Sequence, residues 1–224
     1  MMYSDRTDSE LVDILGQESL LTFEAQLNLQ QELKRRAIAA DTASLDQSIF
    51  KKMQEIKNLD YLKDFGFKAE RIANGIVVTR TKKAIWTDVI GVILGLIVFF
   101  IGLNGIINLV FAFINGDELD VFTLAFKFAV ASLVFIGFSF FSGLKRLFDY
   151  SGFELSNTQG LITLKKRFDV KIEQIQAKAS DLFLDTDEDN LQLKLGKEII
   201  FTSNADSLVQ TMTLEELAKE LKDQ

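Results

Sequence analysis

The organisation of this chain follows from residues 84–141, which read AIWTDVIGVILGLIVFFIGLNGIINLVFAFINGDELDVFTLAFKFAVASLVFIGFSFF. Two long apolar runs, residues 89–114 and 121–142, lie on either side of a short acidic turn at residues 115–120. A helix that crosses the hydrocarbon core of a bilayer needs about 20 mostly apolar residues, and both runs reach that length. The sequence therefore predicts a transmembrane helical hairpin within residues 84–142.

The charges beside the two runs predict how this hairpin is oriented. Arg80, Lys82 and Lys83 precede the first run, Lys145 and Arg146 follow the second, and the turn between them carries only acidic charges. Short loops rich in Lys and Arg remain on the cytoplasmic side of a membrane. We therefore expect a multi-pass protein of the cell membrane with both termini in the cytoplasm and the turn outside.

Small residues indicate which faces of the two spans meet. A helix turns by about 100° per residue, and on this basis the small side chains of each span fall within a narrow arc. Small residues allow helix backbones to approach closely in lipid. The predicted seam consists of Gly91, Gly95 and Gly102 on the first span and Ala125, Ala129 and Ser132 on the second.

Three polar residues within the spans, Asn104, Asn108 and Lys127, fall away from this seam. Lys127 is close enough to the outer end of its helix for the ammonium group to reach the headgroups, and we expect it to do so. Alternatively, the three residues line a polar pathway or face another subunit, as intramembrane polar groups often do.

The composition restricts the chemistry that is available to this protein. The 224 residues carry a net charge of −7, which argues against nucleic-acid binding. The sequence contains no Cys and no His, so thiol chemistry and the commonest general base and metal ligand are missing. We expect no catalytic residues, no cofactor and no metal site, and hence a protein that is not an enzyme.

Residues 1–65 are predicted to form a helical cytoplasmic module, followed by a β-hairpin or connector at residues 66–83. Thr7 and Glu10 have the spacing of a capping box, and so do Ser44 and Gln47. The basic residues 34–36 either contact an anionic partner or form a solvated face at a helix end, where cations are favoured.

Residues 143–224 change to a β pattern that ends in a helix. Leu191, Leu193 and Leu195 alternate with polar residues as in a half-buried strand, and residues 195–198 fit a tight hairpin with glycine in the turn. Thr213 to Glu216 has the pattern of a capping box that opens the final amphipathic helix.

This region resembles a bacterial pleckstrin-homology-type (PH-like) domain, and the whole chain resembles bacterial two-span membrane proteins that carry such a domain. The resemblance lies in residues 160–166 (GLITLKK), 171–175 (KIEQI) and 191–201 before the helix. It implies an antiparallel β domain closed by one helix, which binds proteins, peptides or lipid headgroups and is not catalytic. The basic candidates for headgroup binding are Lys165, Lys166, Arg167 and Lys171, although a plain solvated strand explains them as well.

The predicted fold is therefore an α+β membrane protein with a helical module, a transmembrane hairpin and a PH-like domain. The function expected from it is a non-enzymatic membrane scaffold with cytoplasmic protein partners, and a homo-oligomer is left open. The alternative is a small oligomeric transporter or channel component that uses Asn104, Asn108 and Lys127.

Overall fold

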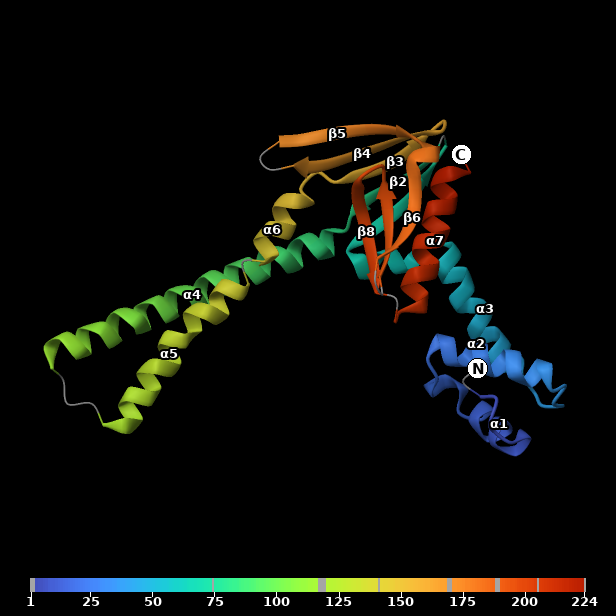
Figure 1. The fold of residues 1–224 in the computed structure, drawn as a ribbon, viewed down its shortest axis with the longest axis horizontal. Coiled ribbons are helices and arrows are strands. Elements are labelled where there is room, and N and C mark those ends of the chain that lie inside the picture. Colours follow the sequence, from blue (N-terminus) through green and yellow to red (C-terminus); the bar gives the residue numbers. More distant parts are fainter. Residues whose placement is uncertain are drawn as a thin grey trace. The chain divides into compact units, whose positions relative to one another are not determined.

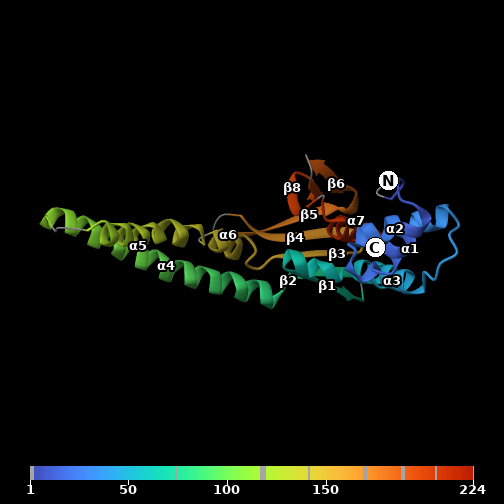
Figure 2. The ribbon, with the colours of Figure 1, turned by 90° about the horizontal axis from the view of Figure 1, so that it is seen from below.

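The structure is a computed structural model, and it describes residues 3–73, 75–116, 120–140, 142–168, 171–187, 190–204 and 206–223. Figures 1 and 2 show its ribbon in two views. The helices are α1 (Asp8–Leu15), α2 (Phe23–Arg35), α3 (Ala43–Lys57), α4 (Lys82–Asn115), α5 (Val121–Ser139), α6 (Ser142–Asp149) and α7 (Leu208–Lys222), with short 3₁₀ turns at η1 (Glu18–Leu20), η2 (Asp60–Phe65) and η3 (Ala179–Asp181). The strands are β1 (Phe67–Ile72), β2 (Gly75–Arg80), β3 (Glu154–Thr158), β4 (Leu161–Phe168), β5 (Lys171–Lys178), β6 (Leu182–Asp187), β7 (Asn190–Leu195) and β8 (Glu198–Asn204).

The chain forms two compact units. The globular unit comprises Met1–Val78, Ser156–Thr163 and Gln176–Gln224, and the hairpin unit comprises Thr79–Leu155 and Leu164–Ile175. The N-terminal helices thus share a unit with the C-terminal sheet and helix. This division follows contacts in space, whereas the predicted segments followed the order of the chain.

The first helices of the globular unit begin at local side-chain caps, with one difference from prediction. The Thr7 amide donates to Glu10 Oε2 at 2.8 Å and the Thr7 hydroxyl accepts from the Glu10 amide at 3.3 Å, so the predicted capping box is confirmed. The second predicted box is wrong, because α3 begins at Ala43 and Ser44 does not cap it. The Ser44 hydroxyl instead donates to the Glu18 carboxylate at 2.7 Å.

The C-terminal part of the globular unit is a three-stranded antiparallel sheet, β6-β7-β8, with α7 beside it (Figure 1). Leu195 pairs with Glu198 across a two-residue turn, so the predicted hairpin is confirmed. Gly196 has φ of +60° there, a backbone conformation that favours glycine. Phe201 of β8 packs edge-on against Phe67 of β1, with the ring centroids 4.9 Å apart.

Helix α7 begins earlier than the capping-box pattern predicts. It starts at Leu208, so Thr213 lies inside the helix and is fully buried. The Thr213 hydroxyl donates to the Val209 carbonyl at 2.7 Å, a bond to the preceding turn that a threonine within a helix can make. Leu208, Val209 and Met212, in the first turns of this helix, pack against the core formed by α1, α2 and α3.

The five remaining strands form a second sheet in the order β1-β2-β3-β4-β5. Strand β2, which precedes the apolar helices in sequence, is therefore hydrogen-bonded to β3, the first strand after them. Asn74, between β1 and β2 in the predicted β-hairpin or connector of residues 66–83, lies outside the described residues.

The hairpin unit contains the two apolar helices, and α4 and α5 run side by side in both views (Figures 1 and 2). The segments Lys82–Asn115 and Val121–Asp149 are long and apolar enough to cross a membrane. Within the most apolar 18 residues of each segment, only 17% of the first and 11% of the second is buried inside the protein. Helix α4 begins before the predicted residue 89, because Thr81 caps it by accepting from the Ala84 amide at 3.2 Å. Residues 117–119 of the predicted outer turn lie outside the described residues.

The contact between α4 and α5 is built on glycines. A Cβ atom added at Gly102 would overlap the backbone of Leu133 and Val134, and one added at Gly105 would lie 2.8 Å from Val130 Cγ1. A Cβ atom added at Gly95 would lie 3.3 Å from the Gly137 carbonyl oxygen. Such close backbone approach requires residues without a side chain.

The structure corrects the predicted seam at four positions. A Cβ atom at Gly91 would have no described neighbour within 4 Å, and Ala125, Ala129 and Ser132 are exposed. On α5 the contact is made instead by the stripe that contains Val130, Val134 and Gly137. Residue size alone does not select the face of α5, because Ala131 and Gly137, the buried residues of that helix, are small as well and lie against the α4 backbone or its glycines.

Candidate functional site

An acidic residue is buried near the start of α4, beside the first apolar run. Asp88 has only 6% of its surface exposed. Its carboxylate forms an ion pair with Arg80 and a second one with Arg146, at 3.5 Å from Nη2. A carboxylate is stable in such a position only when it is paired, so the arginines account for its burial.

Arg80 is the better buried of the two arginines, with 10% of its side chain exposed against 64% for Arg146. It ends β2, directly before the Thr81 cap of α4. Its Nη1 group donates to the Arg146 carbonyl at 3.3 Å, and its guanidinium lies 5.0 Å from the centre of the Tyr150 ring. The buried Nε–H group of Arg80 has no hydrogen-bond partner among the described residues.

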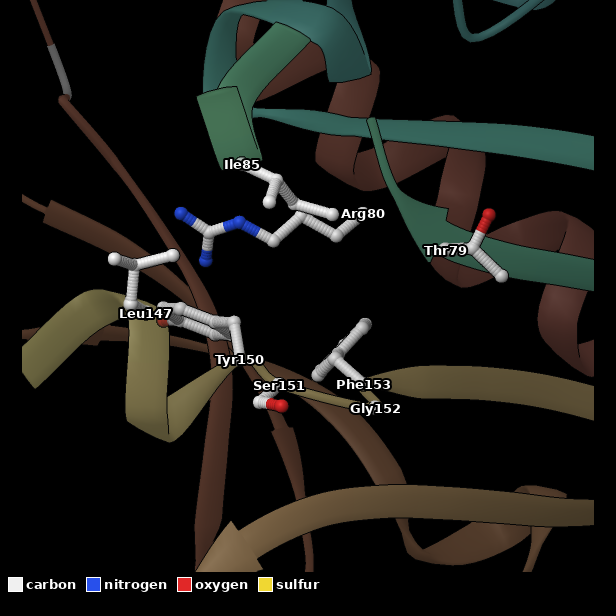
Figure 3. A pocket seen from close by; sticks show the side chains of 8 residues that line it. All are labelled: Thr79, Arg80, Ile85, Leu147, Tyr150, Ser151, Gly152 and Phe153. Atoms are coloured by element: carbon white, nitrogen blue, oxygen red, sulfur yellow. The ribbon is translucent and has the colours of Figure 1, made fainter. Parts of the chain in front are cut away.

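A cavity of about 280 Å³ lies next to this cluster (Figure 3). Its lining combines one cation, three hydroxyl side chains and an apolar wall: Thr79, Arg80, Ile85, Leu147, Tyr150, Ser151, Gly152 and Phe153. Figure 3 shows the Arg80 side chain between Ile85 and the Tyr150 ring. Burial raises the pKa of Tyr150, an effect that the Arg80 charge partly opposes, so the phenol is neutral at pH 7.

The cluster of Arg80, Arg146 and Asp88 carries one net positive charge. Its chemistry is that of an anion-binding site, because guanidinium groups donate to carboxylate and phosphate oxygens.

The basic residues predicted to meet headgroups are spread over β4 and β5. Lys165 donates to Glu154 at 2.9 Å, and the guanidinium of Arg167 lies 5.6 Å from the centre of the Phe148 ring. Lys166 is half-buried and Lys171 is exposed. Lys165 and Arg167 are therefore engaged with neighbouring side chains, and headgroup binding by the four residues stays a prediction.

The polar residues of the apolar helices are only partly brought together. Asn108 donates to Asn104 on the exposed side of α4. Both asparagines line a groove of about 540 Å³ with Ile97, Phe100, Ile101, Gly105 and Val130. Lys127 is half-buried and does not line this groove.

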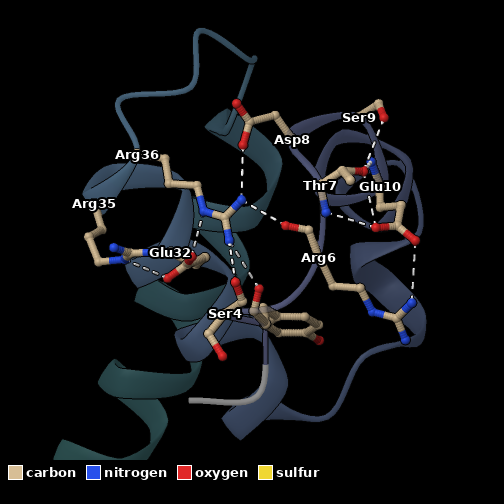
Figure 4. Close-up of polar contacts among 10 residues, drawn as sticks. Ser4, Arg6, Thr7, Asp8, Ser9, Glu10, Glu32, Arg35 and Arg36 are labelled. Carbon is tan, nitrogen blue, oxygen red and sulfur yellow. Dashed lines mark hydrogen bonds and ion pairs between the residues drawn. The ribbon is translucent and has the colours of Figure 1, made fainter.

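The basic residues at the end of α2 are occupied with the protein's own groups (Figure 4). Arg35 and Arg36 both pair with Glu32, whose side chain is 3% exposed. Arg36 also donates to the Ser4 and Arg6 carbonyls at 2.8 and 2.7 Å. Lys34 and Arg35 are exposed, as expected for a solvated helix end, whereas Arg36 ties the start of the chain to α2.

The cluster around Asp88 was not predicted from the sequence. Arg80 and Arg146 were considered only as flanking charges, and Asp88 lies just before the first predicted span. One signal was present: an acidic residue between Trp86 and an apolar run requires a partner. Its partners could not be identified, because Arg146 is far from it in sequence.

Comparisons with protein-family models, with curated proteins and with solved structures found no match to this chain. The geometry of the site is therefore the main guide to its role.

Proposed function

We propose that this protein is a non-enzymatic integral membrane anchor that presents an interaction unit at the cytoplasmic face of the bilayer. The observation that carries the proposal is the exposed apolar surface of α4 and α5. Phe100, Phe122 and Phe135 are 60%, 89% and 77% exposed. Burying that surface in lipid is strongly favourable, whereas water would make it a site of aggregation.

The interaction unit of this proposal is the globular unit, for which we propose a PH-like role. Two features support this role: antiparallel strands after the apolar helices, and a C-terminal helix that packs beside β6-β7-β8. The basic residues before α4 and within α6 support a cytoplasmic position for this unit. Its partners would be proteins, peptides or lipids at the membrane surface.

Membrane anchoring is tested by alkaline extraction of membranes from cells that express the full chain. We expect the wild-type protein to stay in the membrane fraction. The double variant Ile97→Lys/Phe100→Lys should shift into the soluble or aggregated fraction, because each lysine at a helix centre costs about 2.5–3.5 kcal/mol on insertion. Phe50 is similarly exposed (64%) but lies on α3, so Phe50→Lys is the matched control and should remain membrane-bound.

Orientation is tested in the same cells with a reporter fused after residue 224 and a labelling tag within residues 115–120. The reporter should be cytoplasmic and the tag should be labelled from outside. Extraction of the wild-type chain by alkali would refute the anchor, and a reporter outside the cell would refute the orientation.

The second candidate is a component of an oligomeric transporter, and the groove around Asn104 and Asn108 favours it. Polar side chains on the lipid side of a helix are costly unless another helix covers them. Transport predicts that Asn104→Leu and Asn108→Leu abolish function while the protein still inserts. Anchoring predicts that both variants retain it.

A further inference from the structure

We propose that the cavity beside Arg80 binds the phosphate group of an anionic phospholipid. The inference rests on the proposed function, since only a membrane anchor would hold the cavity at the level of the headgroups. It assigns a ligand to a cavity that lies at the start of α4 and beside α6, next to the two apolar helices.

The first argument is the unused donor. Arg80 is nine-tenths buried, and its Nη1 and Nη2 groups are engaged with the Arg146 carbonyl and with Asp88. Its Nε–H has no partner among the described residues, although buried donors are almost always satisfied. An acceptor oxygen in the cavity that Arg80 lines would complete this guanidinium once the side chain turns to expose Nε, which is covered in the structure.

The second argument is the charge. Two arginines surround a single carboxylate, so an anion restores neutrality and a cation is repelled. A phosphodiester offers several acceptor oxygens, and Ser151, which lines the same cavity beyond the Tyr150 ring in Figure 3, offers a hydroxyl donor. An anionic lipid is preferred to a zwitterionic one, because a choline group would bring a positive charge to this cluster.

The third argument is the apolar wall. Ile85 and Leu147 line the same cavity, and exposed apolar residues of α4, from Ile90 onward, continue from there along the helix. A headgroup at Arg80 would therefore let the acyl chains lie along α4. A free phosphate would gain nothing from this wall.

The experiment uses the full-length protein, purified in detergent with an equimolar mixture of phosphatidylglycerol and phosphatidylcholine. Lipids that remain bound are counted by native mass spectrometry. We expect phosphatidylglycerol to be retained about tenfold over phosphatidylcholine, in line with one charge-assisted contact. A parallel thermal-shift measurement with sn-glycerol 3-phosphate asks whether a soluble phosphate suffices, and we expect no shift.

Three variants locate the binding. Ser151→Trp fills the cavity without touching the ion pairs and should abolish the preference. Arg80→Lys keeps the charge but removes the Nε donor, and should reduce the preference strongly. Lys83→Gln removes an exposed charge next to the start of α4 and should leave it nearly unchanged.

The proposal is overturned if the two lipids are retained equally, or if Lys83→Gln reduces the preference as much as Ser151→Trp does. It is also overturned if glycerol phosphate stabilises the protein and Ser151→Trp removes that shift, because the cavity would then be a site for soluble phosphates. If Arg80→Lys does not fold, Ser151→Trp alone decides. If the protein stays in the membrane but shows no lipid preference, only this inference is contradicted. If alkali extracts the protein from the membrane, the proposed anchor function is contradicted as well.

Discussion

Each unit of the molecule buries one carboxylate between two arginines, but the two clusters differ in what they leave unused. Glu32, Arg35 and Arg36 lie within a single helix end, and every guanidinium nitrogen of Arg36 has an acceptor in Glu32, Asp8 or the first residues of the chain (Figure 4). Asp88, Arg80 and Arg146 come from three separate elements, and Arg80 retains a buried donor beside a cavity. The first cluster is saturated and structural, whereas the second has capacity left for a ligand.

The largest effect is expected at the second cluster. Asp88→Ala leaves Arg80 buried without its carboxylate, and breaking a buried ion pair costs about 3–5 kcal/mol. Arg146 is largely exposed, so Arg146→Gln should cost less than about 1 kcal/mol. Denaturant unfolding in detergent measures both values. Similar losses for the two variants would mean that the buried pair of Arg80 and Asp88 does not dominate the stability of this cluster.

The contact between α4 and α5 should give the next largest effect. Gly102→Leu forces a side chain against the Leu133 and Val134 backbone, and overpacking of this kind costs about 1–3 kcal/mol. Gly91→Leu and Ala129→Leu are the controls, because these positions lie outside the contact. The melting temperature in detergent should fall only for Gly102→Leu, and a fall in all three would restore the seam predicted from small residues.

A smaller, pH-dependent effect is expected at the saturated cluster. The Arg35 hydrogen bond, followed by that from Arg36, lowers the pKa of Glu32 from 4.5 to about 2. A lowered pKa stabilises the fold above the unfolded value, and this contribution is lost as the pH falls from about 4.5 toward 2. Wild type should therefore be more stable than Glu32→Gln at pH 7, and the difference should shrink as the pH approaches 2. Glu24→Gln, on the exposed side of α2, is the control and should leave the stability at pH 7 nearly unchanged.

The smallest effect is expected at Lys127. If its ammonium group reaches the outer headgroups, Lys127→Leu removes the cost of a charge near the hydrocarbon and should be neutral or slightly stabilising. Oligomer size by light scattering and the function of the protein should be unchanged. A well-folded Lys127→Leu protein without function would favour the transporter over the anchor.

The sequence alone determined the features that depend on local composition and period. Two runs of apolar residues predict α4 and α5, because the length and hydropathy of a membrane-spanning helix can be read from one continuous stretch of sequence. The Thr7 capping box and the Gly196 hairpin were equally predictable, since the residues that build them are neighbours in the chain.

Only the tertiary structure decided which residues meet across long distances in sequence. The predicted box at Thr213 failed because the helix extends back to Leu208. The predicted face of α5 failed because fit to the α4 glycines, and not residue size on α5 alone, selects the contact. Arg80 and Arg146 read as flanking charges until the fold brought both to Asp88. Periodicity describes one element at a time, whereas a buried charge cluster depends on where several elements cross.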